Sequence, residues 1–243
     1  MTLPTPPLPQ TSPVTSLPNL LARLRRGLIV SCQAEAHEPL HGVQHMAAMA
    51  IAAAEGGAVG IRANSPTDIA AIRAVVSLPI VGIHKVDTPG YSVRITPTLG
   101  DAILVAKAGA DIIAVDATSR THPDGLSLTE RVRLIHEQTG CLVMADIATY
   151  AEGMTAEYAG ADLVATTLSG YTEMSLPQKD PDFELLEQLT YVLKLPVLAE
   201  GRISTPEQAA RALELGAFAV VVGSAITRPQ WITAQFVQRM MNP

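Results

Sequence analysis

The stretch Ala108-Gly109-Ala110-Asp111-Ile112-Ile113-Ala114-Val115-Asp116 contains the pattern that decides the fold. A glycine closes a predicted helix, a short apolar run follows, and one polar residue ends the run. Runs rich in Val and Ile and bounded by Gly or Pro are typical of strands in a buried parallel sheet. The chain contains eight such runs, at Leu28–Cys32, Ala58–Ile61, Ile80–Ile83, Ile112–Val115, Leu142–Ala145, Leu163–Ala165, Val197–Ala199 and Ala219–Val222.

Helical stretches separate the eight runs, so the sequence predicts an α/β protein with a single (β/α)8 TIM barrel. The active site of such a barrel lies at the carboxyl ends of the strands. The residues that end the runs should therefore converge on one face of the molecule. They are Gln33, Arg62, His84 with Lys85, Asp116, Asp146, Thr166, Glu200, and Gly223 with Ser224.

An internal repeat supports the same fold. Gly57, Gly109, Gly160 and Gly216 follow one another at intervals of 51 to 56 residues, and each precedes an even-numbered strand. The repeat unit is thus two β-α units, a quarter of a barrel. We expect each glycine to adopt a left-handed conformation where the helix ends and the chain turns into the strand.

The domain organisation follows from length and from the first residues. A chain of 243 residues fits one barrel. Residues 1–20 contain six prolines but no Lys or Arg, and they lack the basic start and apolar core of a signal peptide. We expect a disordered extension over residues 1–20 and a catalytic barrel over residues 21–243. Residues Leu20 to Arg26 resemble an amphipathic helix that could close the amino-terminal end of the barrel.

Charge and composition limit the partners. The net charge is −6 and no basic run exceeds Arg25-Arg26, which argues against binding to nucleic acid or to an anionic membrane. No apolar run approaches the roughly 18 residues of a membrane span. Only 16% of residues are charged, which favours a buried interface and a homodimer. Cys32 and Cys141 show no metal-binding spacing, so we expect buried reduced thiols and a cytoplasmic protein.

The last two strands end in glycines beside basic residues, which predicts a phosphate site. Strand seven is followed by Gly201 and Arg202, and strand eight by Gly223 and Ser224. In many barrels these two loops hold a phosphate, because glycine lets backbone N–H groups approach the anion. Arg202 or Arg228 could add a fork of donors. The alternative is that Gly223 merely ends a strand.

Acid–base residues gather at other strand ends. Lys85 follows strand three, where burial could lower its pKa enough for a general base or a Schiff-base nucleophile. Asp116, Asp146 and Glu200 end strands four, five and seven. A solvated loop lysine and purely structural ion pairs of the carboxylates are the alternatives.

Metal binding is not favoured. His41 and His45 have the four-residue spacing of a helical metal pair, but they lie beside Gly42 at the start of a helix, with no Glu between them. Solvated or capping histidines fit this position better, and no redox-cofactor motif is present.

Several motifs together resemble the N-acylglucosamine-6-phosphate 2-epimerase family, also called N-acetylmannosamine-6-phosphate 2-epimerases. The likeness runs from about Gly27 to Phe236, and residues Thr166 to Thr172 are its most specific part. The other matching segments are residues 28–33, 56–64, 95–98, 116–118, 144–147, 199–203 and 222–229. The sequence departs from the family pattern at His84 and Val86, which flank Lys85, and in the loop 34–39.

The resemblance implies an isomerase that interconverts N-acetylmannosamine 6-phosphate and N-acetylglucosamine 6-phosphate in sialic acid breakdown, without metal or redox cofactor. It implies that Lys85 and Glu200 are catalytic. It places substrate contacts on Gln33, Arg62, Asp116 and Arg202, and the phosphate on Gly201, Gly223 and Ser224. Two other functions stay open at this point: another acid–base enzyme on a phosphate-binding barrel, and a sugar-phosphate sensor without turnover.

Overall fold

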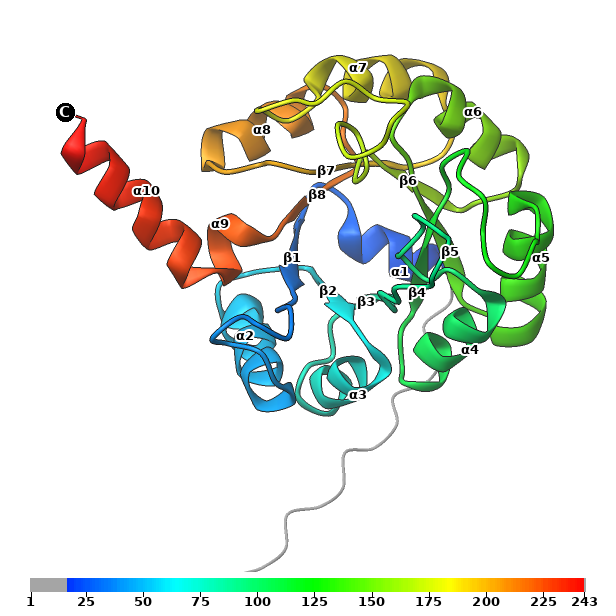
Figure 1. Ribbon diagram of the computed structural model, residues 1–243, viewed down its shortest axis with the longest axis horizontal. Coiled ribbons are helices and arrows are strands. Elements are labelled where there is room, and N and C mark those ends of the chain that lie inside the picture. The colour runs from blue at the N-terminus through cyan, green and yellow to red at the C-terminus, as the bar shows by residue number, and fades with distance from the viewer. Residues whose placement is uncertain (1–16, 243) are drawn as a thin grey trace, which may run out of the picture.

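The computed structural model describes residues 17–242, and its eight strands form a closed, fully parallel barrel in the order β1 to β8 (Figure 1). This confirms the predicted TIM barrel. The strands are β1 Leu28–Cys32, β2 Gly60–Asn64, β3 Ile80–Ile83, β4 Ile112–Asp116, β5 Leu142–Asp146, β6 Leu163–Ala165, β7 Val197–Glu200 and β8 Ala219–Val222.

Most of the helices surround the strands on the outside of the barrel (Figure 1). Polar side chains cap the first turns of six of these helices. In the helix that begins at Leu99, the Thr98 hydroxyl accepts from the Asp101 backbone N–H, and the Asp101 carboxylate accepts from that of Thr98. The helices are α1 Leu17–Leu24, α2 Val43–Glu55, α3 Pro66–Val75, α4 Leu99–Lys107, α5 Leu128–Thr139, α6 Tyr150–Tyr158, α7 Phe183–Val192, α8 Pro206–Glu214, α9 Ser224–Thr227 and α10 Pro229–Met241.

The first helix confirms the expected cover of the amino-terminal end. Leu20 and Leu24 of α1 are buried in one cluster with residues from the starts of the strands, such as Ile112 and Leu142. The helix begins at Leu17, three residues before its predicted start. Residues 17–20 thus belong to this helix and not to the predicted disordered extension. Residues 1–16 lie outside the described part of the chain, where the extension stays a prediction.

Four strands extend beyond the predicted apolar runs, and β2 differs most from its prediction. The apolar run predicted a strand over Ala58–Ile61 that ends before Arg62, but β2 spans Gly60–Asn64. The register explains the shift, because Ser31 and Val81 of the flanking strands both pair with Arg62. Arg62 can occupy the barrel interior because two carboxylates neutralise its charge there.

The repeated glycines have the expected backbone conformation. Gly57, Gly109, Gly160 and Gly216 have φ values of +93°, +103°, +86° and +95°. Each follows a helix and leads into an even-numbered strand, as the repeat predicted. No helix within residues 17–242 combines the length and the hydropathy needed to cross a membrane.

Candidate active site

The pleat of the strands determines which polar side chains enter the barrel. Side chains alternate between two faces, and Val81, Ile83, Ile112, Ala114, Leu198 and Val221 belong to the cluster inside the barrel. Two residues further along each strand, the side chains on the same face form a second, polar layer at the carboxyl ends of the strands. This layer consists of Ser31, Gln33, Arg62, Asn64, Lys85, Asp116, Asp146, Thr167, Glu200 and Gly223.

A charged cluster lies at the centre of this polar layer. The guanidinium of Arg62 binds the carboxylate of Asp146 through two hydrogen bonds of 3.1 and 2.5 Å and Glu200 through one of 2.7 Å. The side chains of Arg62 and Asp146 are 1% and 0% exposed, and that of Glu200 is 13% exposed. Thr167 donates a further hydrogen bond of 2.6 Å to Asp146. One arginine thus serves two buried carboxylates.

Burial gives Glu200 an unusual pKa. Burial raises the pKa of Glu200 to about 7, and the charge of Asp146 adds to this effect, while Arg62, Thr167 and Lys85 oppose it. A carboxyl group in this range can hold or release a proton near neutral pH. Burial opposes the charge of Arg62, but Asp146 and Glu200 outweigh it and raise the pKa of the guanidinium.

Lys85 lies between two neighbouring cavities at the mouth of the barrel. Its backbone N–H donates to the Asn64 side chain at 2.8 Å, and it forms an antiparallel bridge with Ile95. Its Nζ lies 3.5 Å from Oε1 of Glu35. Burial lowers the pKa of Lys85, Glu35 raises it, and Arg62 and Arg94 lower it. The net effect is a lowered pKa, which brings the amine closer to the uncharged form that can act as a base.

Asp116 has a partner that sequence reasoning missed. Its carboxylate accepts hydrogen bonds from Arg120 at 2.5 Å and from the backbone N–H and hydroxyl of Thr118 at 3.0 and 2.6 Å. The spacing of four residues between Asp116 and Arg120 is a signal that could have identified the pair. Asp116 lines one cavity together with Gln33, Arg62 and Lys85.

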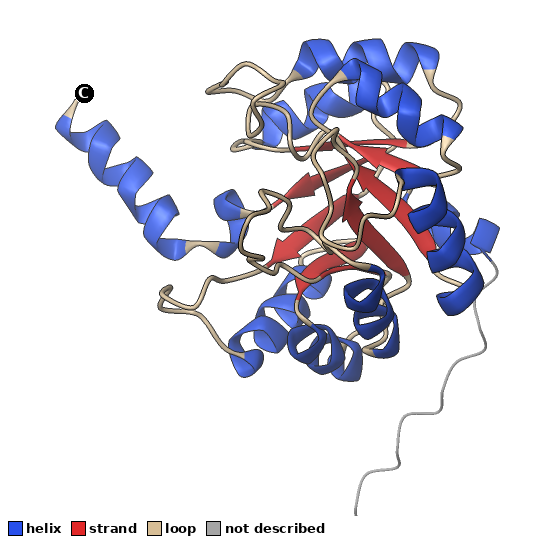
Figure 2. Cartoon of the chain, turned by 45° about the vertical axis from the view of Figure 1, so that its right-hand side comes forward, coloured by secondary structure: helices blue, strands red, loops and turns tan. Residues whose placement is uncertain are grey.

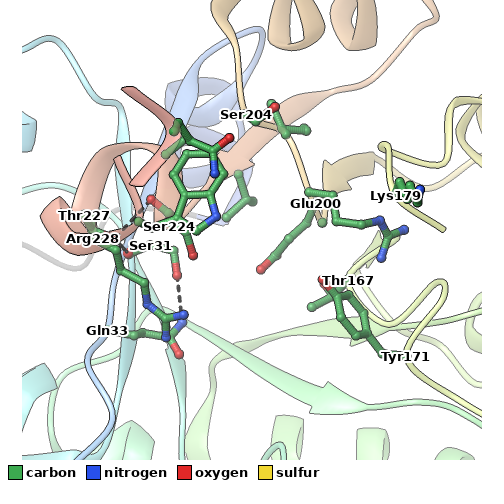
Figure 3. Close-up of a pocket in the computed structure, with 18 of the residues that line it drawn as sticks. Ser31, Gln33, Thr167, Tyr171, Lys179, Glu200, Ser204, Ser224, Thr227 and Arg228 are labelled. Carbon is green, nitrogen blue, oxygen red and sulfur yellow. Dashed lines mark hydrogen bonds between the residues drawn. The ribbon is translucent and has the colours of Figure 1, made fainter. Parts of the chain in front are cut away.

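The predicted phosphate residues surround the other cavity, which has a volume of about 560 Å³. Gly201 and Arg202 both have positive φ values, and Gly223 precedes the short helix α9. Figure 3 shows Glu200 and Thr167 on one side of this space and Ser31, Ser224 and Arg228 on the other. The cavity therefore joins a carboxyl group of the charged cluster to a backbone segment rich in N–H donors.

The two arginines near this cavity already have protein partners. The guanidinium of Arg202 donates to the carbonyls of Ser169 and Asp180 at 2.7 and 2.9 Å and stacks on the Tyr171 ring. Arg228 binds Glu38 at 3.0 Å. The sequence did not single out Lys179, Ser204, Trp231 or Gln235, which also line the cavity.

Several site atoms retain unused hydrogen-bonding capacity. Within residues 17–242, the Nε–H of Arg62 and Oε1 of Gln33 are buried without a hydrogen-bond partner. Both residues line the cavity that contains Asp116. These two unpartnered atoms are therefore enclosed by protein, while other atoms of the same side chains face the cavity. By contrast, the two histidines at four-residue spacing both have a partner. Nδ1 of His41 lies 3.2 Å from the Ala34 carbonyl oxygen, and Nδ1 of His45 lies 3.3 Å from that of His41.

Comparison with known sequences gives a consistent result. The family model described as "Putative N-acetylmannosamine-6-phosphate epimerase" matches residues 46–242. A protein of Caldanaerobacter subterraneus subsp. tengcongensis named "Putative N-acetylmannosamine-6-phosphate 2-epimerase" is 53% identical over 220 residues, covering 90% of this chain and 93% of the relative. A protein of the same name from Clostridium perfringens is 49% identical over 217 residues, covering 89% and 98%.

Comparison with solved structures agrees. The N-acetylmannosamine-6-phosphate 2-epimerase from Clostridium perfringens superposes with a TM-score of 0.89 at 46% identity, covering 94% of this chain and 99% of that one. Thiamine phosphate pyrophosphorylase from Pyrococcus furiosus, at 18% identity and a TM-score of 0.56, shares the fold alone. The family resemblance found in the sequence is thereby confirmed, and the chain belongs to the N-acetylmannosamine-6-phosphate 2-epimerase family.

Proposed function

We propose that this protein interconverts N-acetylmannosamine 6-phosphate and N-acetylglucosamine 6-phosphate by epimerisation at C2, as a step in amino-sugar and sialic acid breakdown. The observation that carries the proposal is the position of Lys85. Its pKa is lowered, and it lies on the same cavity as Glu200, Gly201, Gly223 and Ser224. A base, a proton relay and an anion site are thus adjacent, as an acid–base reaction on a phosphorylated sugar requires.

Inversion at C2 needs an acidic C2–H bond, which exists only when the pyranose opens to the C1 aldehyde. Uncharged Lys85 then removes the C2 proton, and the electron pair forms an enolate with the negative charge on the C1 oxygen. Arg62 and the amide N–H of Gln33, which also donates to Ser31, stabilise this oxygen, because fixed donors act where charge develops. Glu200 helps deliver a proton to C2 from the other face, and the proton taken up by Lys85 returns to Glu200 through water, so neither substrate nor enzyme changes in net charge over the cycle.

Glu200 is the proposed proton relay in this reaction. Its pKa of about 7 allows it to donate a proton to a sugar oxygen and take it back. Its ion pair with Arg62 connects this proton transfer to the donor proposed for the enolate. Asp116, held by Arg120, would accept a hydrogen bond from a sugar hydroxyl.

The phosphate would bind the backbone at Gly201, Gly223 and Ser224. These residues line the same cavity as Lys85. Arg202 would contribute positive charge while its carbonyl partners keep its orientation. Phosphate binding remote from C2 orients the sugar chain and contributes to transition-state binding.

Proton NMR of N-acetylmannosamine 6-phosphate with the protein in D2O tests the reaction. We expect the gluco epimer to appear with deuterium at C2, and the Lys85→Ala variant to keep its fold but lose turnover. Binding without any turnover would indicate a sensor instead. A near-normal rate in Lys85→Ala would remove Lys85 from the base role.

A homodimer is proposed from the last helix. All of residues 233–242 are exposed, including Phe236, Val237 and Met240, and α10 points away from the barrel (Figures 1 and 2). An apolar groove of about 460 Å³ lies outside β8, lined by Leu28, Ala209, Leu213, Val220, Val222 and Ile226 among others. A second copy can fill this groove with its own α10, in a reciprocal exchange with twofold symmetry. We also propose a cytoplasmic location, because Cys32 and Cys141 are free thiols.

Light scattering after size-exclusion chromatography tests the homodimer. We expect twice the chain mass of 25.6 kDa. A monomer at all concentrations would contradict the exchange without affecting the proposed reaction.

A further inference from the structure

The loop between β1 and α2 brings a carboxylate to the proposed base. Oε1 of Glu35 lies 3.5 Å from Nζ of Lys85, and the two side chains are 35% and 25% exposed. Glu35 lies on a loop of ten residues between Cys32 and Val43, and Lys85 is held by its bridge to Ile95 and its hydrogen bond to Asn64. The contact is therefore an ion pair at the entrance of the cavity.

The loop is organised around Glu38. The backbone N–H of Glu35 donates to Oε2 of Glu38 at 2.7 Å, and the N–H of Glu38 donates back to the Glu35 carbonyl at 2.9 Å. The other carboxylate oxygen of Glu38 accepts from Arg228 at 3.0 Å and from Gln230 at 2.8 Å. The position of Glu35 thus depends, through Glu38, on Arg228, which lines the cavity with Gly223 and Ser224.

Other charges near Lys85 have different partners. Glu200 of β7 binds Arg62 of β2, and Arg94, from the segment after β3, binds Asp87. Arg62 and Arg94 disfavour a charged Lys85, whereas Glu35 favours it. Glu35 is therefore the carboxylate whose distance from Lys85 most directly controls the charge of the amine.

We propose that Glu35 is a removable charge partner that keeps Lys85 protonated in the empty site and withdraws when the sugar phosphate binds. This inference rests on the proposed function, because a base must be uncharged to take the C2 proton. The phosphate group competes with Glu38 for Arg228, which releases the loop that holds Glu35. Lys85 then loses its extra proton to water, and its electron pair becomes available for C2.

The pH dependence of the kinetics tests this directly, because kcat/KM reports the free enzyme and kcat reports the complex. In Glu35→Gln, we expect the acidic limb of kcat/KM to move down by about one pH unit. We expect the acidic limb of kcat to stay in place, because Glu35 has already left Lys85 in the complex. Glu35→Asp should fall between the wild type and Glu35→Gln.

A matched control separates this effect from net charge. Glu55→Gln removes the same charge from the exposed end of α2 and should leave both limbs in place. Equal displacement of both limbs in Glu35→Gln would show that Glu35 stays beside Lys85 in the complex, which overturns the proposed withdrawal. An unmoved kcat/KM limb would overturn the role of Glu35 as a charge partner.

A readout independent of turnover distinguishes failure of this inference from failure of the proposed function. The chain has four lysines, Lys85, Lys107, Lys179 and Lys194, so a carbon-13 label at lysine Cε gives a spectrum simple enough to titrate. Comparison with Lys85→Met identifies the Lys85 signal. In Glu35→Gln this signal should titrate about one pH unit lower than in the wild type. An identical titration would overturn the inference even if the wild type epimerises the sugar.

Discussion

Arg62 shows how one residue serves both stability and chemistry. It neutralises Asp146 and Glu200 in the interior of the barrel. Removal of one partner from a buried ion pair leaves an uncompensated charge, which costs about 3–5 kcal/mol. Arg62→Met should therefore lower the free energy of unfolding by about this amount and also stop turnover.

Urea unfolding of Arg62→Met measures the loss. Arg133→Met is the matched control, because Arg133 forms an exposed pair with Glu137. Such pairs contribute only about 0–1 kcal/mol. Equal losses in the two variants would contradict the assigned cost of an unpaired Asp146.

Glu200 should give the folding free energy a particular pH dependence. Its pKa rises from 4.5 to about 7 on folding, so between these pH values the folded state binds more protons than the unfolded state. The free energy of unfolding contributed by Glu200 therefore falls as the pH rises through this window. Glu200→Gln cannot lose this proton, so its stability relative to the wild type should increase by roughly 2 kcal/mol from pH 5 to pH 7.

Urea unfolding at pH 5 and pH 7 checks this expectation. Glu187→Gln, on the exposed side of α7, is the control for a general effect of charge. A constant difference between Glu200→Gln and wild type at the two pH values would argue against the raised pKa.

The ends of the apolar runs predict Gln33, Lys85, Asp116 and Glu200 as site residues, because polar residues after such runs meet at one end of a barrel. Their individual partners were not predictable. The sequence does not show that Arg62 pairs with Asp146 across the barrel or that Arg202 binds two carbonyls. Such contacts depend on the register of the strands and on the conformation of the loops. Glu35 was missed for the same reason.

At the scale of elements, replacing a repeated glycine with alanine should cost more stability at some of the four positions than at others. Gly57 and Gly109 both have positive φ, so alanine at either position is strained, at a cost of about 1 kcal/mol. At Gly109 a Cβ would also lie 3.0 Å from Cγ of Arg73, whereas at Gly57 it would meet nothing within 4 Å. Arg73 binds the Gly109 carbonyl and Asp111, so its displacement would disturb both contacts.

Gly109→Ala should therefore lower the free energy of unfolding by about 1 kcal/mol more than Gly57→Ala. Thermal or urea unfolding of the two variants makes the comparison. Equal losses would mean that Arg73 moves aside without cost.

The limits of the strands illustrate what periodicity can and cannot establish. Every strand overlaps one of the predicted apolar runs, but β2, β4, β5 and β7 each extend beyond their run to include a charged residue. Composition alone ends a strand at the first charge, because an isolated charge is costly to bury. Partners from other strands remove that cost, and they become visible only when the barrel closes.

At the scale of the whole molecule, the last helix connects assembly with the site. Trp231 and Gln235 of α10 line the cavity that contains Lys85, while Phe236 and Met240, further along the same helix, are exposed. The sequence alone could not decide whether this helix covers its own barrel or a second copy, because apolar residues on a helix do not identify the surface that they contact. The proposed exchange would hold the cavity wall in place through the partner.

The double variant Phe236→Asp/Met240→Asp should therefore dissociate the dimer and raise KM at least severalfold, because Trp231 would lose its fixed position. Trp231 is the only tryptophan, so its fluorescence reports on this wall directly. Tyr191→Asp changes an aromatic residue on α7 that is even more exposed, and it should leave mass, KM and fluorescence unchanged. A monomeric double variant with unchanged KM and fluorescence would show that the wall of the site does not depend on the partner.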